Sequence, residues 1–243
     1  MSPTRKTALV AGIFYLITFI ASIPALVLIG PVLHNPDYII SSGSDTRVVA
    51  GCLLDLVNAI ASVGTAVTLF PVARRQNEGL ALGFVASRSF EAAVIVIGVV
   101  SLLAVVTLRH DLAGAPGTDS AVLVTTGRSL VAVRDWTFLL GPGLMPAFNA
   151  LCLGSVLYRS RLVPRVIPAV GLAGAPLLVA VAVATLFGVN TQTSPLSEVA
   201  TIPIFAWELS VGVYMAVKGF RPSPITDGTA PACAPPARCE AVA

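Results

Sequence analysis

The stretch ALGFVASRSFEAAVIVIGVVSLLAVV, residues 81–106, decides the fold of this chain. It is an apolar run long enough to cross a bilayer, whose hydrocarbon core takes about 20 helical residues. Arg88 and Glu91 lie inside the run, three residues apart, and therefore share one face of a helix. A charge at this depth costs roughly 2.5–3.5 kcal/mol on insertion scales, so it normally faces a partner or a water-filled cavity. The stretch is therefore predicted to be a membrane span whose charges have something to pair with.

The composition of the whole chain also indicates a membrane protein. Of its 243 residues, 56% are hydrophobic and only 11% are charged, whereas about 25% are charged in soluble proteins. A soluble protein this apolar could not cover its surface with polar groups, but a bundle of lipid-facing helices can. The net charge of +3 is too small to indicate a nucleic-acid partner, so the lipid bilayer is the partner we expect. Basic residues that are nearly all Arg, with many Ala, Val and Gly, are typical of a GC-rich bacterial genome, and the plasma membrane is the predicted location.

Six apolar segments predict an all-α bundle of six transmembrane helices within one domain, residues 1–220. The expected spans are about 9–32, 48–72, 81–106, 135–158, 166–187 and 196–217. The first span lacks a clear cleavage site and is expected to be retained. Residues 221–243 are rich in Pro and Ala, cannot bury enough apolar surface to fold, and are predicted to be a disordered tail. No His or Cys spacing indicates a metal site, and no cofactor is expected.

Irregular segments divide the spans. Gly141 to Pro146 holds two prolines and two glycines in six residues, which predicts a kinked or broken fourth span. Ser120 to Val133 is predicted to be a short helix that lies on the membrane surface. The small residues Gly171, Gly174 and Ala175 of the fifth span favour close helix contact.

The basic residues predict the orientation of the bundle, because short cytoplasmic loops carry an excess of Lys and Arg. One side receives nine of them: Arg5, Lys6, Arg74, Arg75, Arg159, Arg161, Arg165, Lys218 and Arg221. The other side receives four, which are Arg47, Arg109, Arg128 and Arg134. Both termini are therefore expected in the cytoplasm.

Four charged residues are predicted to form one layer near the middle of the membrane. A rise of about 1.5 Å per residue places Arg88, Glu91 and Glu208 at similar depths, with Asp55 close to them. One Arg would then face three carboxyls, so either one or two of the carboxyls are protonated or a cation completes the cluster. Asn58, which lies on the second span with Asp55, and Asn149, which lies on the fourth span, are further candidates for ligand contact.

Three interpretations of this layer remain open. It is a site that binds or moves a small ligand, a proton or an ion, or its charges only fix helix packing in a structural or regulatory protein. A third interpretation is an intramembrane enzyme that acts on lipid with the carboxyls as acid and base, although the sequence favours a non-enzymatic role. A binding site predicts a polar cavity that solvent can reach, packing predicts a sealed core, and an enzyme predicts a cavity open to lipid.

Five stretches resemble a family of bacterial membrane proteins known as domain of unknown function 4386. They are AGIFYLITF (residues 11–19), AVTLFPVARRQNE (66–78), ASRSFEA (86–92), LYRSRLVPR (157–165) and, within residues 203–220, PIFAWEL and KGF. The resemblance implies a multi-span membrane protein and places Arg88, Glu91 and Glu208 within family-like stretches. It implies no activity, substrate or cofactor.

Overall fold

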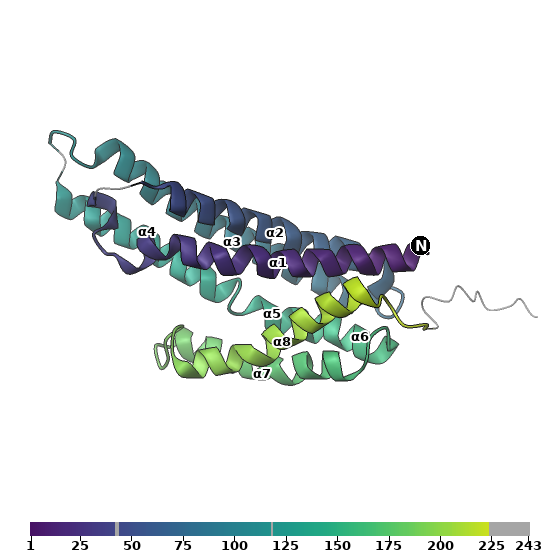
Figure 1. Cartoon of the computed structure of the whole chain (residues 1–243). Helices are drawn as coiled ribbons and strands as arrows, with labels where there is room; N and C mark the ends of the chain where they lie inside the picture. The colour runs from purple at the N-terminus through teal and green to yellow at the C-terminus, as the bar shows by residue number, and fades with distance from the viewer. Residues whose placement is uncertain (42–43, 118, 224–243) are drawn as a thin grey trace, which may run out of the picture.

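The computed structural model describes residues 1–41, 44–117 and 119–223, and all regular structure in these ranges is helical (Figure 1). The elements, in order, are α1 (Pro3–His34), η1 (Tyr38–Ile40), α2 (Thr46–Ala73), α3 (Glu78–Leu112), α4 (Ser120–Leu140), α5 (Met145–Asn149), the π-helical turn η2 (Ala150–Gly154), α6 (Ser155–Ser160), α7 (Val166–Leu186) and α8 (Pro195–Val217). Residues 224–243, most of the predicted tail, lie outside the described residues.

Within the described ranges, six helical segments are long and apolar enough to cross a membrane. They are α1, α2, α3, the segment Ser120–Ser160, α7 and α8. The prediction of an all-helical, multi-span membrane protein is therefore confirmed. All of these segments except α7 are longer than the sequence indicated. α3 has 35 residues and at 1.5 Å per residue is about 52 Å long, more than the roughly 30 Å of a hydrocarbon core.

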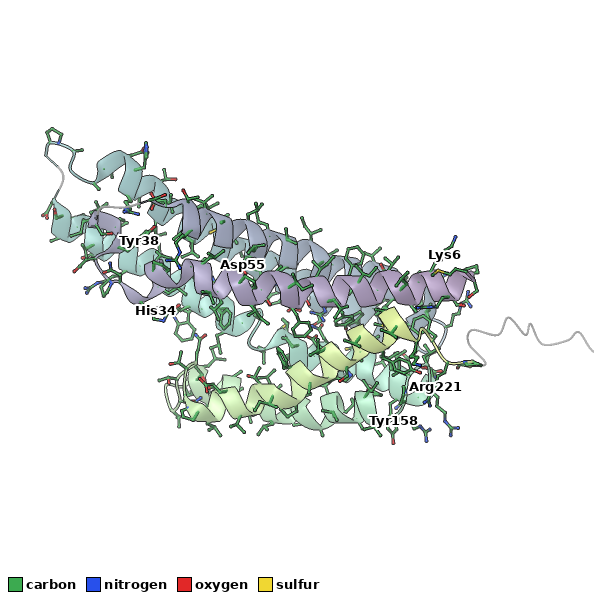
Figure 2. The ribbon with its side chains drawn as sticks, viewed as in Figure 1. Lys6, His34, Tyr38, Asp55, Tyr158 and Arg221 are labelled. Atoms are coloured by element: carbon green, nitrogen blue, oxygen red, sulfur yellow. The ribbon has the colours of Figure 1, made fainter. Side chains whose placement is uncertain are left out.

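Both described ends of the chain lie at one end of the bundle, which we call the termini end (Figure 1). Here Arg5 of α1 donates hydrogen bonds to the carbonyls of Met215, Ala216 and Val217, the last residues of α8. The opposite end, which contains η1, is called the loop end. Figure 2 shows Lys6 and Arg221 at the termini end and Tyr38 at the loop end.

The predicted surface helix over Ser120 to Val133 is wrong, because these residues belong to α4 and continue without interruption into the fourth span. α4 packs along α3 and η1 instead of lying apart from the bundle. Leu123 joins a core with Leu102 and Val105 of α3. A Cβ at Gly127 would lie 3.1 Å from the side chain of Ile39, so the missing side chain lets η1 approach.

The predicted break in the fourth span is present. α4 ends at Leu140, four residues form turns, and the helix resumes at Met145. Pro142 has no N–H to donate, so it cannot continue the ladder of hydrogen bonds. The N–H of Gly143 bonds the carbonyl of Phe138, and the chain turns at Gly141 with a backbone ψ of −96°. The break divides one long apolar segment into two half-helices.

Small residues set the position of α7 and α8. A Cβ at Gly12 of α1 would lie 2.5 Å from the backbone nitrogen of Ala216, so α1 and α8 touch backbone to backbone. Gly171 and Gly174 of α7 make the close contacts that the sequence predicted, against Trp207 and Pro203 of α8. These contacts fix α8 against two neighbours and determine where its one mid-helix acid, Glu208, lies.

Two segments outside the spans are held by specific hydrogen bonds. At the loop end, Tyr38 donates to Asp45 at 2.6 Å, and Arg109 pairs with Asp45. Burial raises the pKa of Tyr38 to about 12, and its hydrogen bond to Asp45 acts in the same direction. At the termini end, the N–H of Arg221 donates to the carbonyl of Leu162, and Ser223 donates to Ser160. These bonds attach residues 221–223 to the end of α6 and to the turn that follows it.

Candidate functional site

Arg88 is the centre of a buried cluster of charges between α3 and α8. Its side chain is almost fully buried, with only 1% of the residue exposed. One guanidinium nitrogen, Nη1, donates to Glu91 Oε2 at 3.1 Å, and the other, Nη2, donates to Glu208 Oε1 at 2.5 Å. The predicted convergence of Arg88, Glu91 and Glu208 is therefore present. With both acids ionised, the three side chains carry one net negative charge.

Aromatic rings surround the guanidinium. It lies 5.1 Å from the ring centroid of Tyr15 and 5.9 Å from that of Phe84, and such contacts stabilise a buried cation. Tyr15 comes from α1, and Gly212 of α8 makes room for its side chain. The close crossing of α1 and α8 thus brings a ring onto the charge that α3 and α8 share.

Asn149 completes the cluster, which we call the carboxyl site (Arg88, Glu91, Asn149 and Glu208). Its side chain is fully buried, and Nδ2 donates to Glu91 Oε2 at 2.9 Å. Asn149 is the last residue of α5 and directly precedes the π-helical turn η2. Turns of this kind occur frequently at functional sites. The amide oxygen of Asn149 has no hydrogen-bond partner among the described residues.

A cavity of about 150 Å³, the Glu cavity, adjoins the carboxyl site. Arg88, Glu91 and Glu208 line it together with Asn58, whose side chain makes no hydrogen bond to the described residues. Glu91 Oε1 and Glu208 Oε2 likewise accept no hydrogen bond from the described residues, since only the other oxygen of each acid accepts one. The remaining wall is supplied by Thr18, Phe19, Ser22, Pro142, Pro146, Leu178, Thr201, Ile204 and Phe205. Two acceptors and an amide are therefore available to a ligand.

Asp55, predicted in the same layer, does not pair with Arg88. Asp55 pairs instead with Arg134 of α4, at 3.3 Å between Nη2 and Oδ2. Arg134, one of the four basic residues predicted on the other side of the membrane, is buried, and its guanidinium lies 5.0 Å from the ring of Phe138. The sequence indicates this pair only if the fourth helix is taken to begin at Ser120, because Arg134 then lies well inside that helix.

Asp55 and Arg134 line a second cavity of about 250 Å³, the Arg134 cavity. It shares six residues of its wall with the Glu cavity, so the two spaces are adjacent. The shared residues are Phe19, Ser22, Asn58, Pro142, Thr201 and Phe205. The broken helix therefore contributes Pro142 to both cavities.

The sequence profile of a domain of unknown function, DUF4386, matches residues 10–219. The chain belongs to this family. The matched range contains every member of the carboxyl site as well as Asp55 and Arg134. No curated protein and no solved structure matches the chain.

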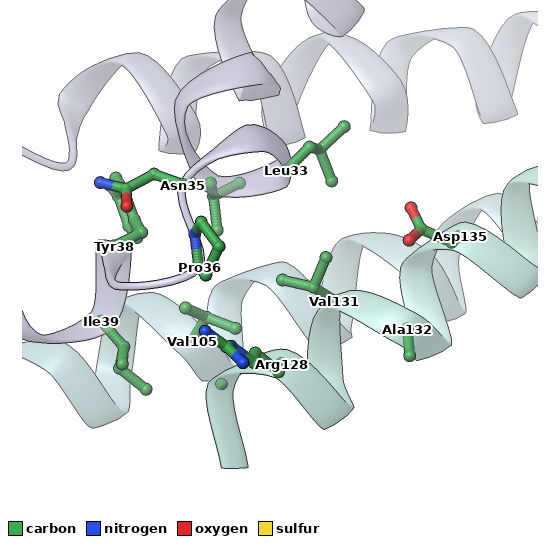
Figure 3. Close-up of a pocket in the computed structure, with 12 residues that line it drawn as sticks. Leu33, Asn35, Pro36, Tyr38, Ile39, Val105, Arg128, Val131, Ala132 and Asp135 are labelled. Atoms are coloured by element: carbon green, nitrogen blue, oxygen red, sulfur yellow. The ribbon is translucent and has the colours of Figure 1, made fainter. Parts of the chain in front are cut away.

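This DUF4386 chain has a further cavity of about 350 Å³ at the loop end, between η1 and α4 (Figure 3). Figure 3 shows Arg128 and Asp135 on the α4 wall with Val131 between them, while Asn35, Pro36 and Tyr38 belong to the opposite wall. Most of the remaining lining is apolar. In the described part of the chain, no group of three or more His, Cys, Asp or Glu side chains is placed to hold a metal ion.

Proposed function

We propose that this membrane protein binds one positive charge, either a proton or a monovalent cation such as Na⁺, at the carboxyl site. The observation that carries the proposal is the charge balance. One guanidinium faces two carboxyl groups, and the surplus negative charge lies in a buried setting where an uncompensated charge is costly. A single added positive charge makes the site neutral. Glu91 Oε1 and Glu208 Oε2 both remain available to it.

The broken fourth helix supports the choice of a cation. The C-terminal end of a helix carries a partial negative charge. Pro142 has no N–H for the carbonyl of Phe138, which accepts from Gly143 instead. Pro142 itself lines the Glu cavity. Half-helix ends of this kind coordinate ions in membrane transporters. We therefore infer that the cation exchanges through the cavity and that the protein is a carrier or an ion-responsive membrane component.

The test is the thermal stability of the purified protein in detergent. NaCl is titrated against choline chloride at constant ionic strength, and the pH is varied separately in choline chloride alone. We expect one of the two ligands to raise the unfolding midpoint of the wild type, because a ligand that binds only the folded state stabilises it. Glu208→Gln should remove this dependence, since it leaves one positive and one negative charge at the site.

Glu198→Gln is the matched control, because Glu198 lies exposed in the first turn of the same helix α8. It should respond to both ligands like the wild type. The competing interpretation, in which the buried charges only fix packing, predicts a different pattern. In that case neither Na⁺ nor protons would shift the wild-type midpoint differently from that of Glu208→Gln, and our proposal would be contradicted.

A further inference from the structure

The pair of Arg134 and Asp55 is an incomplete ion pair in a largely apolar cavity. Both side chains are more than nine-tenths buried, and they touch only through Nη2 and Oδ2, 3.3 Å apart. Arg134 Nε and Nη1 and Asp55 Oδ1 make no hydrogen bond within the described part of the chain. Buried ionic groups normally satisfy their remaining donors and acceptors. Arg134 and Asp55, which carry these unsatisfied atoms, both line the Arg134 cavity.

We propose that the Arg134 cavity binds a small zwitterion with an apolar side group. A ligand carboxylate would take the free donors of Arg134, and a ligand ammonium would take the free oxygen of Asp55. The protein pair is neutral, so a zwitterion adds no net charge to the cavity. A ligand with one charge would satisfy one member of the pair and leave a surplus charge buried, which is unfavourable.

The walls of the cavity define the rest of the ligand. They include Phe19, Leu26, Ile95 and Phe205, with the polar side chains of Asn58 and Thr201 at the border with the Glu cavity. The volume of about 250 Å³ is below the roughly 300–1,000 Å³ of pockets for drug-sized molecules. A compact molecule of the size of an amino acid with an aliphatic or aromatic side chain meets these requirements.

Gly98 of α3 provides room for the arginine. A Cβ at Gly98 would lie 2.9 Å from Arg134 Cδ and 2.7 Å from Thr137 Oγ1. Gly98→Ala is therefore expected to displace the guanidinium without a change of charge. Gly98→Ala therefore tests whether ligand binding depends on the position of the Arg134 guanidinium while its charge is kept.

The experiment measures binding of three ligands that share an isobutyl group to the full-length protein in nanodiscs. L-leucine carries both charges, isopentylamine carries only the ammonium, and isocaproate carries only the carboxylate. We expect radiolabelled L-leucine to bind the wild type, and the two single-charge analogues to compete at least about ten-fold more weakly. Arg134→Gln/Asp55→Asn removes both charges together, leaves no unpaired ion, and should abolish leucine binding. Gly98→Ala should weaken leucine binding.

Two control variants test whether leucine binding depends on an exposed charge of α4 or on the carboxyl site. Arg128→Gln removes an exposed charge on the same helix α4 and should leave leucine binding unchanged. Glu208→Gln should retain it as well, since the zwitterion does not use the carboxyl site. The proposal is overturned if L-leucine does not bind the wild type, if all three ligands compete equally, or if the double variant still binds.

Discussion

At the scale of single residues, Arg88 determines whether the carboxyl site is stable. Its guanidinium neutralises one of two buried acids and contacts both of them. Removing one partner from a buried ionic cluster leaves uncompensated charge, whereas replacing the whole cluster by neutral groups does not. The stability of the protein should therefore depend more on Arg88 than on any exposed arginine.

Arg88→Gln is predicted to lower the free energy of unfolding by about 3–5 kcal/mol, because Glu91 and Glu208 lose their shared counter-ion. The triple variant Arg88→Gln/Glu91→Gln/Glu208→Gln should recover most of this loss, since no charge remains buried. Equilibrium unfolding by SDS in mixed micelles measures both. Arg128→Gln, an exposed arginine on α4, serves as the control and should stay close to the wild type. An Arg88→Gln protein as stable as the wild type would show that the ion pairs carry no net stability.

At the scale of elements, the crossing of α1 and α8 brings the site together. Gly12 and Gly212 let the two backbones approach, and this approach places Tyr15 of α1 beside the Arg88 and Glu208 pair. The break in the fourth helix has a comparable effect, because it places Pro142 against both cavities and Asn149 against Glu91. Neither the crossing nor the break contributes a charge, yet both position charged groups.

Gly12→Ala is predicted to destabilise the protein by about 1–3 kcal/mol, because the new Cβ would lie 2.5 Å from the backbone nitrogen of Ala216 and the backbone cannot move aside cheaply. Gly30→Ala is the matched control on the same helix α1. Its nearest neighbour is the imidazole of His34 at 3.7 Å, an ordinary contact. Thermal unfolding of both variants in detergent tests the prediction, and equal midpoints would contradict the close crossing.

At the scale of the whole molecule, the basic residues are distributed unevenly between the two ends. Nine of those identified from the sequence lie at the start of α1, between α2 and α3, from the end of α6 to the start of α7, or after α8, and all these segments belong to the termini end (Figure 1). Arg134 is one of the four residues predicted at the other end, but it lines the Arg134 cavity and pairs there with Asp55, which leaves three at the loop end. The asymmetry is therefore stronger than the sequence suggested, and the positive-inside rule predicts the termini end in the cytoplasm.

Reporter fusions measure this orientation in bacterial cells. Green fluorescent protein fused after residue 243 should fluoresce, because it folds in the cytoplasm. Alkaline phosphatase inserted at Gly114, in the turn after α3, should be active because it folds only where disulfides form. The reverse pattern of activities would mean that the bundle is inserted in the opposite direction.

The sequence by itself determined the fold class, because apolar segments of sufficient length have few alternatives in a bilayer, where every backbone group must be satisfied internally. It also determined the broken helix, since proline lacks an N–H, and the local Arg88 and Glu91 pair, since i and i+3 share a helix face. Glu208 was assigned to this pair from depth alone, and the structure agrees.

Only the tertiary structure decided which partner each remaining charge takes. Depth along the membrane is one coordinate, whereas pairing also depends on how each helix is rotated and which helices are neighbours. Asp55 shares a similar predicted depth with Arg88, yet α2 directs it toward Arg134 on α4. The four charged residues predicted in one layer therefore line two adjacent cavities, with Asp55 in the Arg134 cavity and the other three in the Glu cavity. Helix contacts between residues as far apart in sequence as Gly12 and Ala216 fix those rotations, and no local pattern specifies them.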